Sequence, residues 1–294
     1  MKLFPLLLFF AFPFVQCVRS NSSELSGASE PTSKNSTTTD SVGLIDTAGM
    51  TILKRFNLPE GYVRVECVSQ QFGYYLRNLP LKPSGEKVKY FDGRTKDKLN
   101  VYAAVVDLPI GKRDLHQCAD AVMRLRAEYL WEQERYDDIH FNYTNGFKAE
   151  YARWMKGERM VVEGNRVSYK KVAQPSNTAK DLWNYLEQVF TYCGTLSLSQ
   201  ELKSIEVKNI EPGDVFIKGG SPGHAVIVLD VARNEKTGKK IFLLGQSYMP
   251  AQEIQVLVNP VNTDLSPWYS EDFGEVLYTP EWTFKKSELM RFTI

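Results

Sequence analysis

The sequence predicts an α+β fold in which helices come first and an antiparallel sheet follows. A stretch near residue 120 carries apolar residues at helical spacing. Two later runs, apolar and rich in β-branched residues, are joined by a short polar loop, as in a hairpin. The chain has 294 residues, of which 43% are hydrophobic, and this is enough to bury one sizeable core. We therefore expect residues 47–294 to form a single globular domain.

The helix is predicted from the segment DLHQCADAVMRLRAEYL, residues 114–130. Asp114 and Gln117 have the spacing of a capping pair at a helix start, and the pattern continues to about residue 135. One apolar stripe recurs through Leu115, Cys118, Val122, Leu125 and Tyr129. Cys118 then lies in the first turn and faces inward, while Arg124 and Arg126 fall outside the stripe. Such a cysteine is either an inert small hydrophobe or a thiol whose pKa is lowered by the helix macrodipole.

Shorter elements are expected before this helix. The segments GYVRVECVS, VKYFDG and NVYAAVVDLP have strand patterns, and the last is apolar enough for a central strand. Between them, QFGYYLRNLPLKP predicts a short helix that Pro80 and Pro83 end. After the long helix, KDLWNYLEQVFTYCGTLSLSQEL is mainly helical.

A second chemically informative residue lies in PGDVFIKGGSPGHAVIVLD. His224 opens an apolar strand directly after a Gly/Ser/Pro turn, and the loop RNEKTGKK joins this strand to another. A hairpin centred near Lys236 pairs residues whose numbers sum to roughly 472. This register places Gln246 and Tyr248 opposite the start of the first strand, on the face that His224 shares with Val226. Gln246 is therefore predicted to neighbour His224 and to fix the tautomer of its imidazole through the amide oxygen.

The N-terminal segment predicts export. Residues 1–17, MKLFPLLLFFAFPFVQC, have one Lys and then an apolar stretch too short for a membrane span, which is typical of a signal peptide. Cys17 stands where a bacterial lipoprotein would be lipidated, but Gln16 is a poor residue there, so both outcomes stay open. Residues 18–46 are Ser/Thr-rich and predict a disordered tether. We expect a protein of the periplasm or cell envelope, touching the membrane only through a lipid on Cys17.

Composition excludes several other classes. A formal net charge of +1 without long runs of like charge argues against a nucleic-acid partner. The absence of a phosphate loop or dinucleotide fingerprint predicts no organic cofactor. No metal site is expected, since His116 and Cys118 would point to different sides of a helix. Whether Cys67 and Cys193 form a disulfide is left open.

The stretches QCADA, PGDVFIKGGSPGHAVIVLD and GQSYMP resemble the Cys, His and polar-residue elements of the CHAP and NlpC-type amidases and peptidases. That resemblance implies a papain-like fold, in which an N-terminal helix carrying the Cys packs on an antiparallel sheet. It also implies that Cys118 is the nucleophile, His224 the base and Gln246 the orienting residue. Because Cys118 and His224 are further apart than in compact members, residues 136–205 would be a helical insertion. From RFNLPEGYVRV onward, the chain also resembles an uncharacterised bacterial family, domain of unknown function 4846.

Two functions follow as hypotheses. The first is an exported thiol hydrolase that cleaves an amide or isopeptide bond, with peptidoglycan as the candidate substrate and Gln117 as an oxyanion donor by its position. The second is a catalytically inert surface module that binds cell-wall glycan or peptide fragments. Its binding surface would be an aromatic stripe, which is more often core: Phe141, Tyr143, Phe147, Tyr151 and Trp154.

Overall fold

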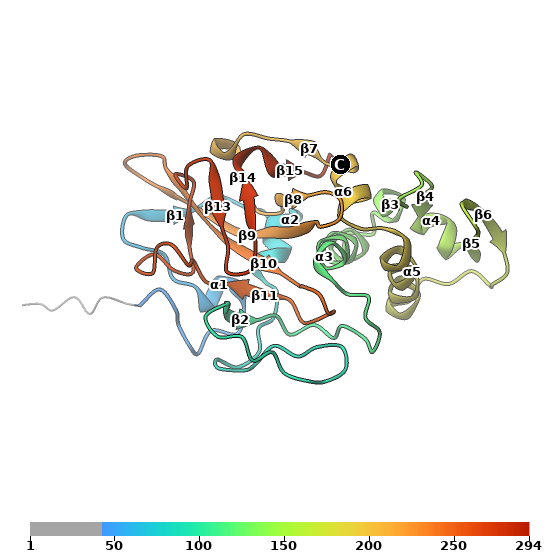
Figure 1. Cartoon of the computed structure of the whole chain (residues 1–294), viewed down its shortest axis with the longest axis horizontal. Coiled ribbons are helices and arrows are strands. Elements are labelled where there is room, and N and C mark those ends of the chain that lie inside the picture. The colour runs from blue at the N-terminus through green and yellow to red at the C-terminus, as the bar shows by residue number, and fades with distance from the viewer. Residues whose placement is uncertain (1–42, 294) are drawn as a thin grey trace, which may run out of the picture. The chain divides into compact units, whose positions relative to one another are not determined.

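The computed structural model describes residues 43–293. The predicted export signal, Cys17 and residues 18–42 of the predicted tether lie outside this range. Ile45, near the end of the predicted tether, pairs with Phe56 through an isolated bridge. Figure 1 shows one large sheet with few helices, which confirms the predicted α+β class.

The helices of the described residues are α1 (Ile52–Arg55), α2 (Phe72–Arg77), α3 (Cys118–Glu132), α4 (Tyr151–Met155), α5 (Ala179–Tyr192) and α6 (Thr195–Glu201). Short 3-10 helices span Tyr136–Asp138, Val207–Asn209 and Lys286–Glu288. The strands of the large sheet are β1 (Tyr62–Arg64), β2 (Tyr102–Val105), β7 (Lys203–Ser204), β8 (Val215–Lys218), β9 (His224–Asn234), β10 (Lys240–Gln246), β11 (Gln255–Leu257), β12 (Tyr269–Ser270) and β15 (Leu289–Arg291). Separate hairpins are formed by β3 (His140–Asn142) with β4 (Lys148–Glu150), β5 (Glu158–Glu163) with β6 (Arg166–Lys171), and β13 (Val276–Tyr278) with β14 (Thr283–Lys285). No helix among these residues is long and apolar enough to cross a bilayer.

The large sheet has the strand order β2-β11-β10-β9-β8-β15-β7, with β1 added to β9 and β12 to β10. The predicted central strand of NVYAAVVDLP is instead the edge strand β2. This edge strand is apolar because the segment around Lys82 runs along its free edge, where the Lys82 backbone N–H donates to the Val105 carbonyl. The predicted strand VKYFDG is a loop that forms only isolated bridges, at Lys89 and Tyr90.

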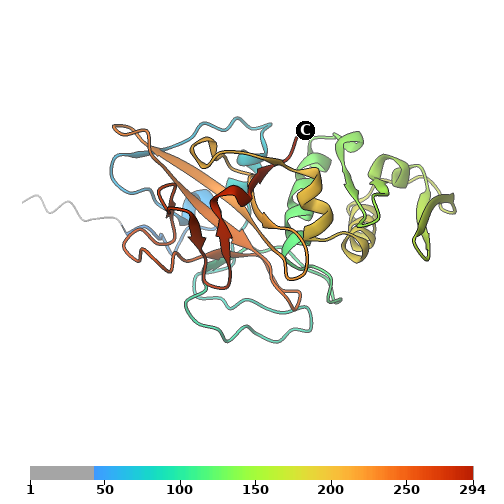
Figure 2. The ribbon, with the colours of Figure 1, turned by 45° about the horizontal axis from the view of Figure 1, so that its top comes forward.

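The β9–β10 hairpin has the predicted register at its start. Gly245 pairs with Ile227 and Leu244 with Val228, and a bulge then shifts the rest of the hairpin by one residue. Alternate residues of β9 enter two cores. Ile227 and its neighbours on one face pack under α2, α3 and α5, while Val228 and its neighbours on the other pack under the β13–β14 hairpin. Figure 2 shows these two strands as the longest of the sheet.

Helix α3 begins at Cys118, three residues later than expected if Asp114 were the capping residue. The N-cap residue is Gln117, whose backbone N–H donates to Asp120 Oδ2 at 2.9 Å. Asp114 does not cap the helix, because its Oδ1 accepts from the Ala251 backbone N–H at 2.7 Å and so joins the loop after β10. The prediction that Cys118 lies in the first turn and faces inward is confirmed.

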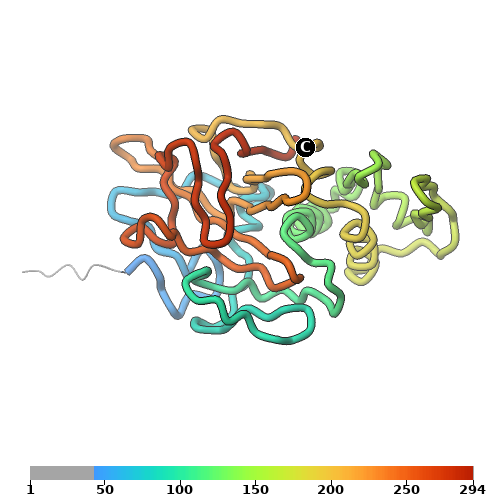
Figure 3. Tube along the Cα trace, viewed as in Figure 1, coloured from blue at the N-terminus to red at the C-terminus, as the bar shows by residue number. Residues whose placement is uncertain are grey.

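Residues 136–192 form a lobe on the side of α3 that faces away from the sheet, as the green to olive trace of Figure 3 shows. The end of the expected insertion 136–205 instead joins the sheet, since α6 contacts β8 and β7 pairs with β15. The lobe is not simply helical, because it contains the β3–β4 and β5–β6 hairpins besides α4 and α5. Arg124 and Arg126, which fall outside the apolar stripe, are both buried. The Arg124 guanidinium lies over the Trp183 ring of the lobe at 5.0 Å. The Arg126 guanidinium lies over the rings of Phe72, Tyr129 and Phe292, which are outside the lobe.

Candidate active site

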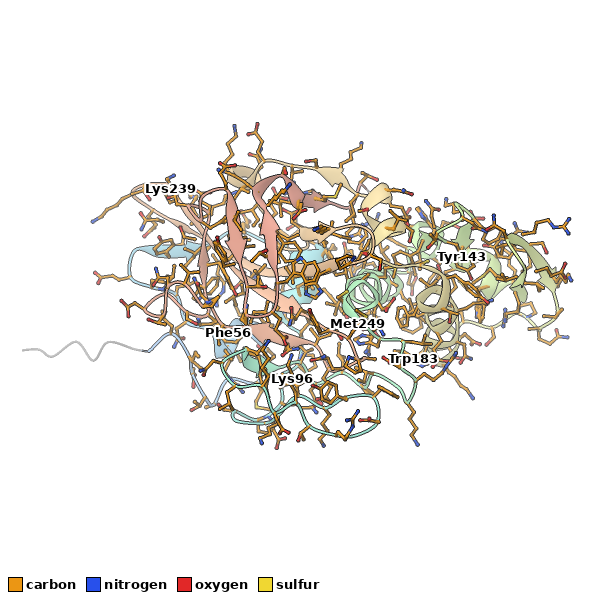
Figure 4. All side chains as sticks on the ribbon, in the orientation of Figure 1. Phe56, Lys96, Tyr143, Trp183, Lys239 and Met249 are labelled. Carbon is orange, nitrogen blue, oxygen red and sulfur yellow. The ribbon has the colours of Figure 1, made fainter. Side chains whose placement is uncertain are left out.

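A cleft of 310 Å³ lies at the N-terminus of α3. One wall is formed by residues 117–120, and the opposite wall by the turn 220–223 and the first residue of β9. The junction of α5 and α6, the residues after β10 and the β13–β14 turn close the remaining sides. In Figure 4, Met249 from the segment after β10 is labelled beside α3. Cys118 and His224 both border this cleft.

Cys118 is 8% exposed and is the first residue of α3. Three backbone N–H groups point toward its sulfur, from Ala225, from Ala119 and from Cys118 itself. These groups favour the thiolate, but burial outweighs them and raises the pKa of the Cys118 thiol to about 11. The N–H groups at the helix N-terminus thus act in the direction expected of a macrodipole, but burial makes the net shift upward and the thiol is neutral at pH 7.

His224 is 2% exposed at the start of β9. Its Nε2 lies 2.9 Å from Gln246 Oε1, so the predicted neighbour is in place. Tyr248 and Trp282 flank the ring, with centroid distances of 4.7 Å and 5.4 Å. Burial lowers the pKa of the imidazole to about 4, although the hydrogen bond that its Nε2–H donates to Gln246 Oε1 favours the charged form. The imidazole is neutral at pH 7.

Sequence reasoning missed the residues behind Gln246. Gln246 Nε2 donates to Glu281 Oε2 at 2.7 Å, and this carboxylate is paired with the Lys96 ammonium. Trp282 and Tyr248, which contact the ring, were not predicted as site residues. Lys96 and Glu281 are far apart in the chain and have no motif in common, so no pattern links them to His224.

Gln117, the predicted oxyanion donor, borders the cleft. Its side-chain Nε2 donates to Asp114 Oδ1 at 3.1 Å, which ties one amide hydrogen to the loop before α3. Asp120 borders the same cleft and is buried. Its Oδ1 has no hydrogen-bond partner, and burial raises the pKa of the carboxyl to about 8.

The other candidate features take no part in this cleft. Most of the aromatic stripe is core, since Phe141, Tyr143, Tyr151 and Trp154 are at most 5% exposed, while Phe147 is half-buried against the same core. Within residues 43–293 no three His, Cys, Asp or Glu side chains are grouped to hold a metal ion. Cys67 and Cys193 are free thiols in the structure.

The fold and the cleft together define an α+β protein whose cleft holds the buried thiol of Cys118 and the buried imidazole of His224, with the side-chain amide of Gln246 hydrogen-bonded to that imidazole. The chain belongs to the family described as "Domain of unknown function (4846)", whose model matches residues 52–291. No curated protein and no solved structure matches it. The resemblance to CHAP and NlpC-type amidases thus has no support from these comparisons, and function has to be argued from the cleft.

Proposed function

We propose that this protein is an exported thiol hydrolase that cleaves an amide or isopeptide bond, with Cys118 as nucleophile, His224 as base and Gln246 as orienting residue. The observation that carries the proposal is the 2.9 Å contact between His224 Nε2 and Gln246 Oε1 in a cleft that Cys118 also borders. Nucleophile, base and orienting group are the three parts that activate a thiol.

The reaction uses Nδ1 of His224, because Nε2 is engaged by Gln246. Sγ of Cys118 attacks the carbonyl carbon while its proton passes to Nδ1, and the carbonyl electron pair moves onto oxygen. The C–N bond then breaks, the leaving amine takes the proton from Nδ1, and a thioester remains on Cys118. Water attacks this thioester with His224 again as base, which releases the acid and restores the thiol.

Both reacting groups are neutral in the resting cleft, so this is general-base catalysis rather than attack by a preformed thiolate. The N–H groups of Cys118, Ala119 and Ala225 that point toward the sulfur support the proposal, since they stabilise negative charge at that end of the cleft. The second amide hydrogen of Gln117 adds a donor for the oxyanion in this scheme.

The proposed substrate is a peptide or glycopeptide fragment of peptidoglycan. The pattern of residues 1–17 supports this substrate, because it is typical of an export signal and the proposed location is the periplasm or cell envelope. A lipid on Cys17 is one of the two outcomes that the sequence leaves open. In this proposal the fold is papain-like, supported by the packing of α3 on an antiparallel sheet with Cys118 at its N-terminus.

The test is release of new free amines from muramidase-digested peptidoglycan, followed by chromatography. Cys118→Ala should abolish release, and His224→Ala should be almost as damaging, because nucleophile and base act as a unit. Gln246→Ala should reduce the rate by about 10- to 100-fold, as for a supporting group.

The matched control is Cys67→Ala, which removes a thiol away from the cleft. It should release amines at the wild-type rate. Equal release by wild type and Cys118→Ala would overturn the proposal.

A second candidate is the inert binding module, and the raised pKa of Cys118 favours it. Wild type and Cys118→Ala would then both bind the digested fragments in an equilibrium assay, with no amine released by either. Since most of the aromatic stripe is buried, this candidate assigns binding to the cleft. A Met249→Trp substitution should then weaken binding without disturbing the core, because Met249 lines the cleft and is 59% exposed.

A further inference from the structure

A buried polar chain extends from the imidazole of His224 across the sheet. Gln246 links His224 to Glu281, which lies in the turn between β13 and β14. Glu281 is ion-paired with Lys96, and the side chains of this pair are 8% and 3% exposed. Figure 4 labels Lys96 at the sheet edge, and it comes from the long loop before β2.

The donors and acceptors along this chain can be assigned in only one way. A carboxylate accepts hydrogen bonds and cannot donate them, so Gln246 turns its NH₂ group toward Glu281. Its amide oxygen then faces His224. Because that oxygen also only accepts, Nε2 of His224 carries the hydrogen and Nδ1 keeps its lone pair.

Lys96 holds the carboxylate in place. Its ammonium donates to Glu281 Oε2 and to Gln252 Oε1 at 3.0 Å, and it lies 3.4 Å from Gln255 Oε1. Gln255 in turn donates to Gln252 Oε1 at 2.9 Å. All three donors of the ammonium are therefore directed at fixed oxygens, and Glu281 cannot turn away from Gln246 without leaving a buried cation unpaired.

We propose that Glu281 and Lys96 are positioning residues for the reaction, because they fix the amide orientation of Gln246 and through it the Nε2–H tautomer of His224. The inference rests on the proposed function of the same cleft. Without the carboxylate, the Gln246 amide can turn over, and its NH₂ group then faces Nε2. The favoured tautomer becomes Nδ1–H, which has no lone pair to accept the thiol proton.

The role is one of orientation rather than charge. Glu281 raises the pKa of His224 and Lys96 lowers it, so the two charges act against each other at the imidazole. A neutral replacement of Glu281 that still accepts the hydrogen bond from Gln246 should therefore keep the Nε2–H tautomer of His224. Apolar replacements of both Lys96 and Glu281 should abolish the preference for this tautomer.

The test compares Glu281→Gln with the double variant Lys96→Met/Glu281→Leu. The Gln side chain still offers an amide oxygen to Gln246 and Lys96, so it is the conservative rescue. The double variant removes both charges together, because a buried ion pair replaced by apolar residues of similar volume usually leaves a folded protein.

The first readout is the tautomer of His224, measured by ¹⁵N NMR of histidine-labelled protein. The chain has only three histidines, and His224→Gln identifies the resonances of interest. Wild type and Glu281→Gln should show a single Nε2–H form. The double variant should show a mixture of tautomers or the Nδ1–H form.

The second readout is the rate of amine release from muramidase-digested peptidoglycan. The double variant should lose about 10- to 100-fold in kcat with little change in KM, because a supporting group acts on the base rather than on substrate binding. The matched control is Lys82→Met/Glu253→Leu, another partly buried Lys–Glu pair, which makes no contact with Gln246. It should keep the Nε2–H tautomer and the wild-type kcat.

A folded double variant that keeps the single Nε2–H tautomer would overturn the inference. The inference would also be overturned if the control Lys82→Met/Glu253→Leu showed the same change of tautomer as the Lys96/Glu281 double variant. The NMR result is independent of catalysis. If the double variant changes the tautomer of His224 but the wild type releases no amines, the proposed function is refuted. The assignment of Glu281 and Lys96 as residues that fix the tautomer then still holds.

Discussion

Cys118 and His224 are both deeply buried, and burial acts on the two groups in opposite directions. It raises the pKa of the thiol to about 11 and lowers that of the imidazole to about 4. Near pH 7 neither group is charged, so the proton has to move during attack on the substrate. Rapid alkylation by small reagents is thus not expected even of an active enzyme.

The reactivity of Cys118 toward iodoacetamide tests this electrostatic picture. In a Cys67→Ala/Cys193→Ala background, Cys118 is the remaining cysteine of the described residues, and its labelling is measured on the peptide that contains it so that Cys17 does not contribute. Labelling should rise with pH up to about 11. At pH 7 it should be roughly 100-fold slower than for free cysteine, whose pKa is lower. A rate that levels off below pH 8 would show a thiolate, and the neutral-pair scheme would then be wrong.

At the scale of the element, the start of α3 depends on a buried carboxyl. Asp120 Oδ2 accepts the backbone N–H of Gln117, while its Oδ1 has no partner. The folded-state pKa is raised from 3.8 to about 8. A group with a raised folded pKa stabilises the fold fully below its unfolded pKa, and this contribution is lost as pH rises through the folded value. Ionisation of Asp120 therefore weakens the fold between about pH 4 and pH 8.

Asp120→Asn removes this titration but keeps an oxygen for the Gln117 N–H. The free energy of unfolding, measured in urea at pH 5, 6.5 and 8, should shift in favour of the variant as pH rises. The lowered pKa values of His116 and His224 have the opposite effect, because the stabilisation that these groups contribute to the fold is lost as pH falls below 6.5. They are present in both proteins and cancel in the difference. A wild-type–variant difference that does not change with pH would contradict the raised pKa.

Local patterns predicted the elements that carry the site. Period-2 alternation and the short loop RNEKTGKK sufficed to place Gln246 beside His224, because the bulge in the hairpin lies beyond that end. Helical spacing placed Cys118 in the first turn of α3. The exact start of the helix was wrong, since it depends on the long-range hydrogen bond between Asp114 and Ala251. No local pattern contains such a contact.

Long-range packing explains what the sequence did not show. Arg124 falls outside the apolar stripe of its helix, yet the lobe of residues 136–192 covers it with Trp183. Lys96 and Glu281 belong to no sequence motif, yet they form the buried pair behind Gln246. Both differences arise because the partners of these charges come from segments far away in the chain.

At the scale of the whole molecule, the C-terminal hairpin β13–β14 completes the site. It covers the second face of the sheet through Phe284, which is 1% exposed and packs against Phe216 and His224. The same hairpin brings Glu281 to Gln246 and Trp282 to the ring of His224. Stability of the second core and geometry of the base are therefore coupled.

Phe284→Ala should lower the free energy of unfolding by about 3–5 kcal/mol, the usual cost of deleting a buried Phe side chain. Tyr278→Ala in the same hairpin is the control. That side chain is 53% exposed, and its loss should change stability by less than about 0.5 kcal/mol. Equal losses for the two variants, measured by urea denaturation, would show that the hairpin does not close a core.

The central claim is that Cys118 forms a covalent thioester with the substrate, and intact-mass spectrometry tests it most directly. Wild-type protein is mixed with muramidase-digested peptidoglycan, quenched in acid and digested to locate any adduct. We predict an acyl adduct on the peptide that contains Cys118, which disappears as substrate is consumed and is absent from Cys118→Ala. Amine release with no adduct on Cys118, or no amine release at all, would contradict the account.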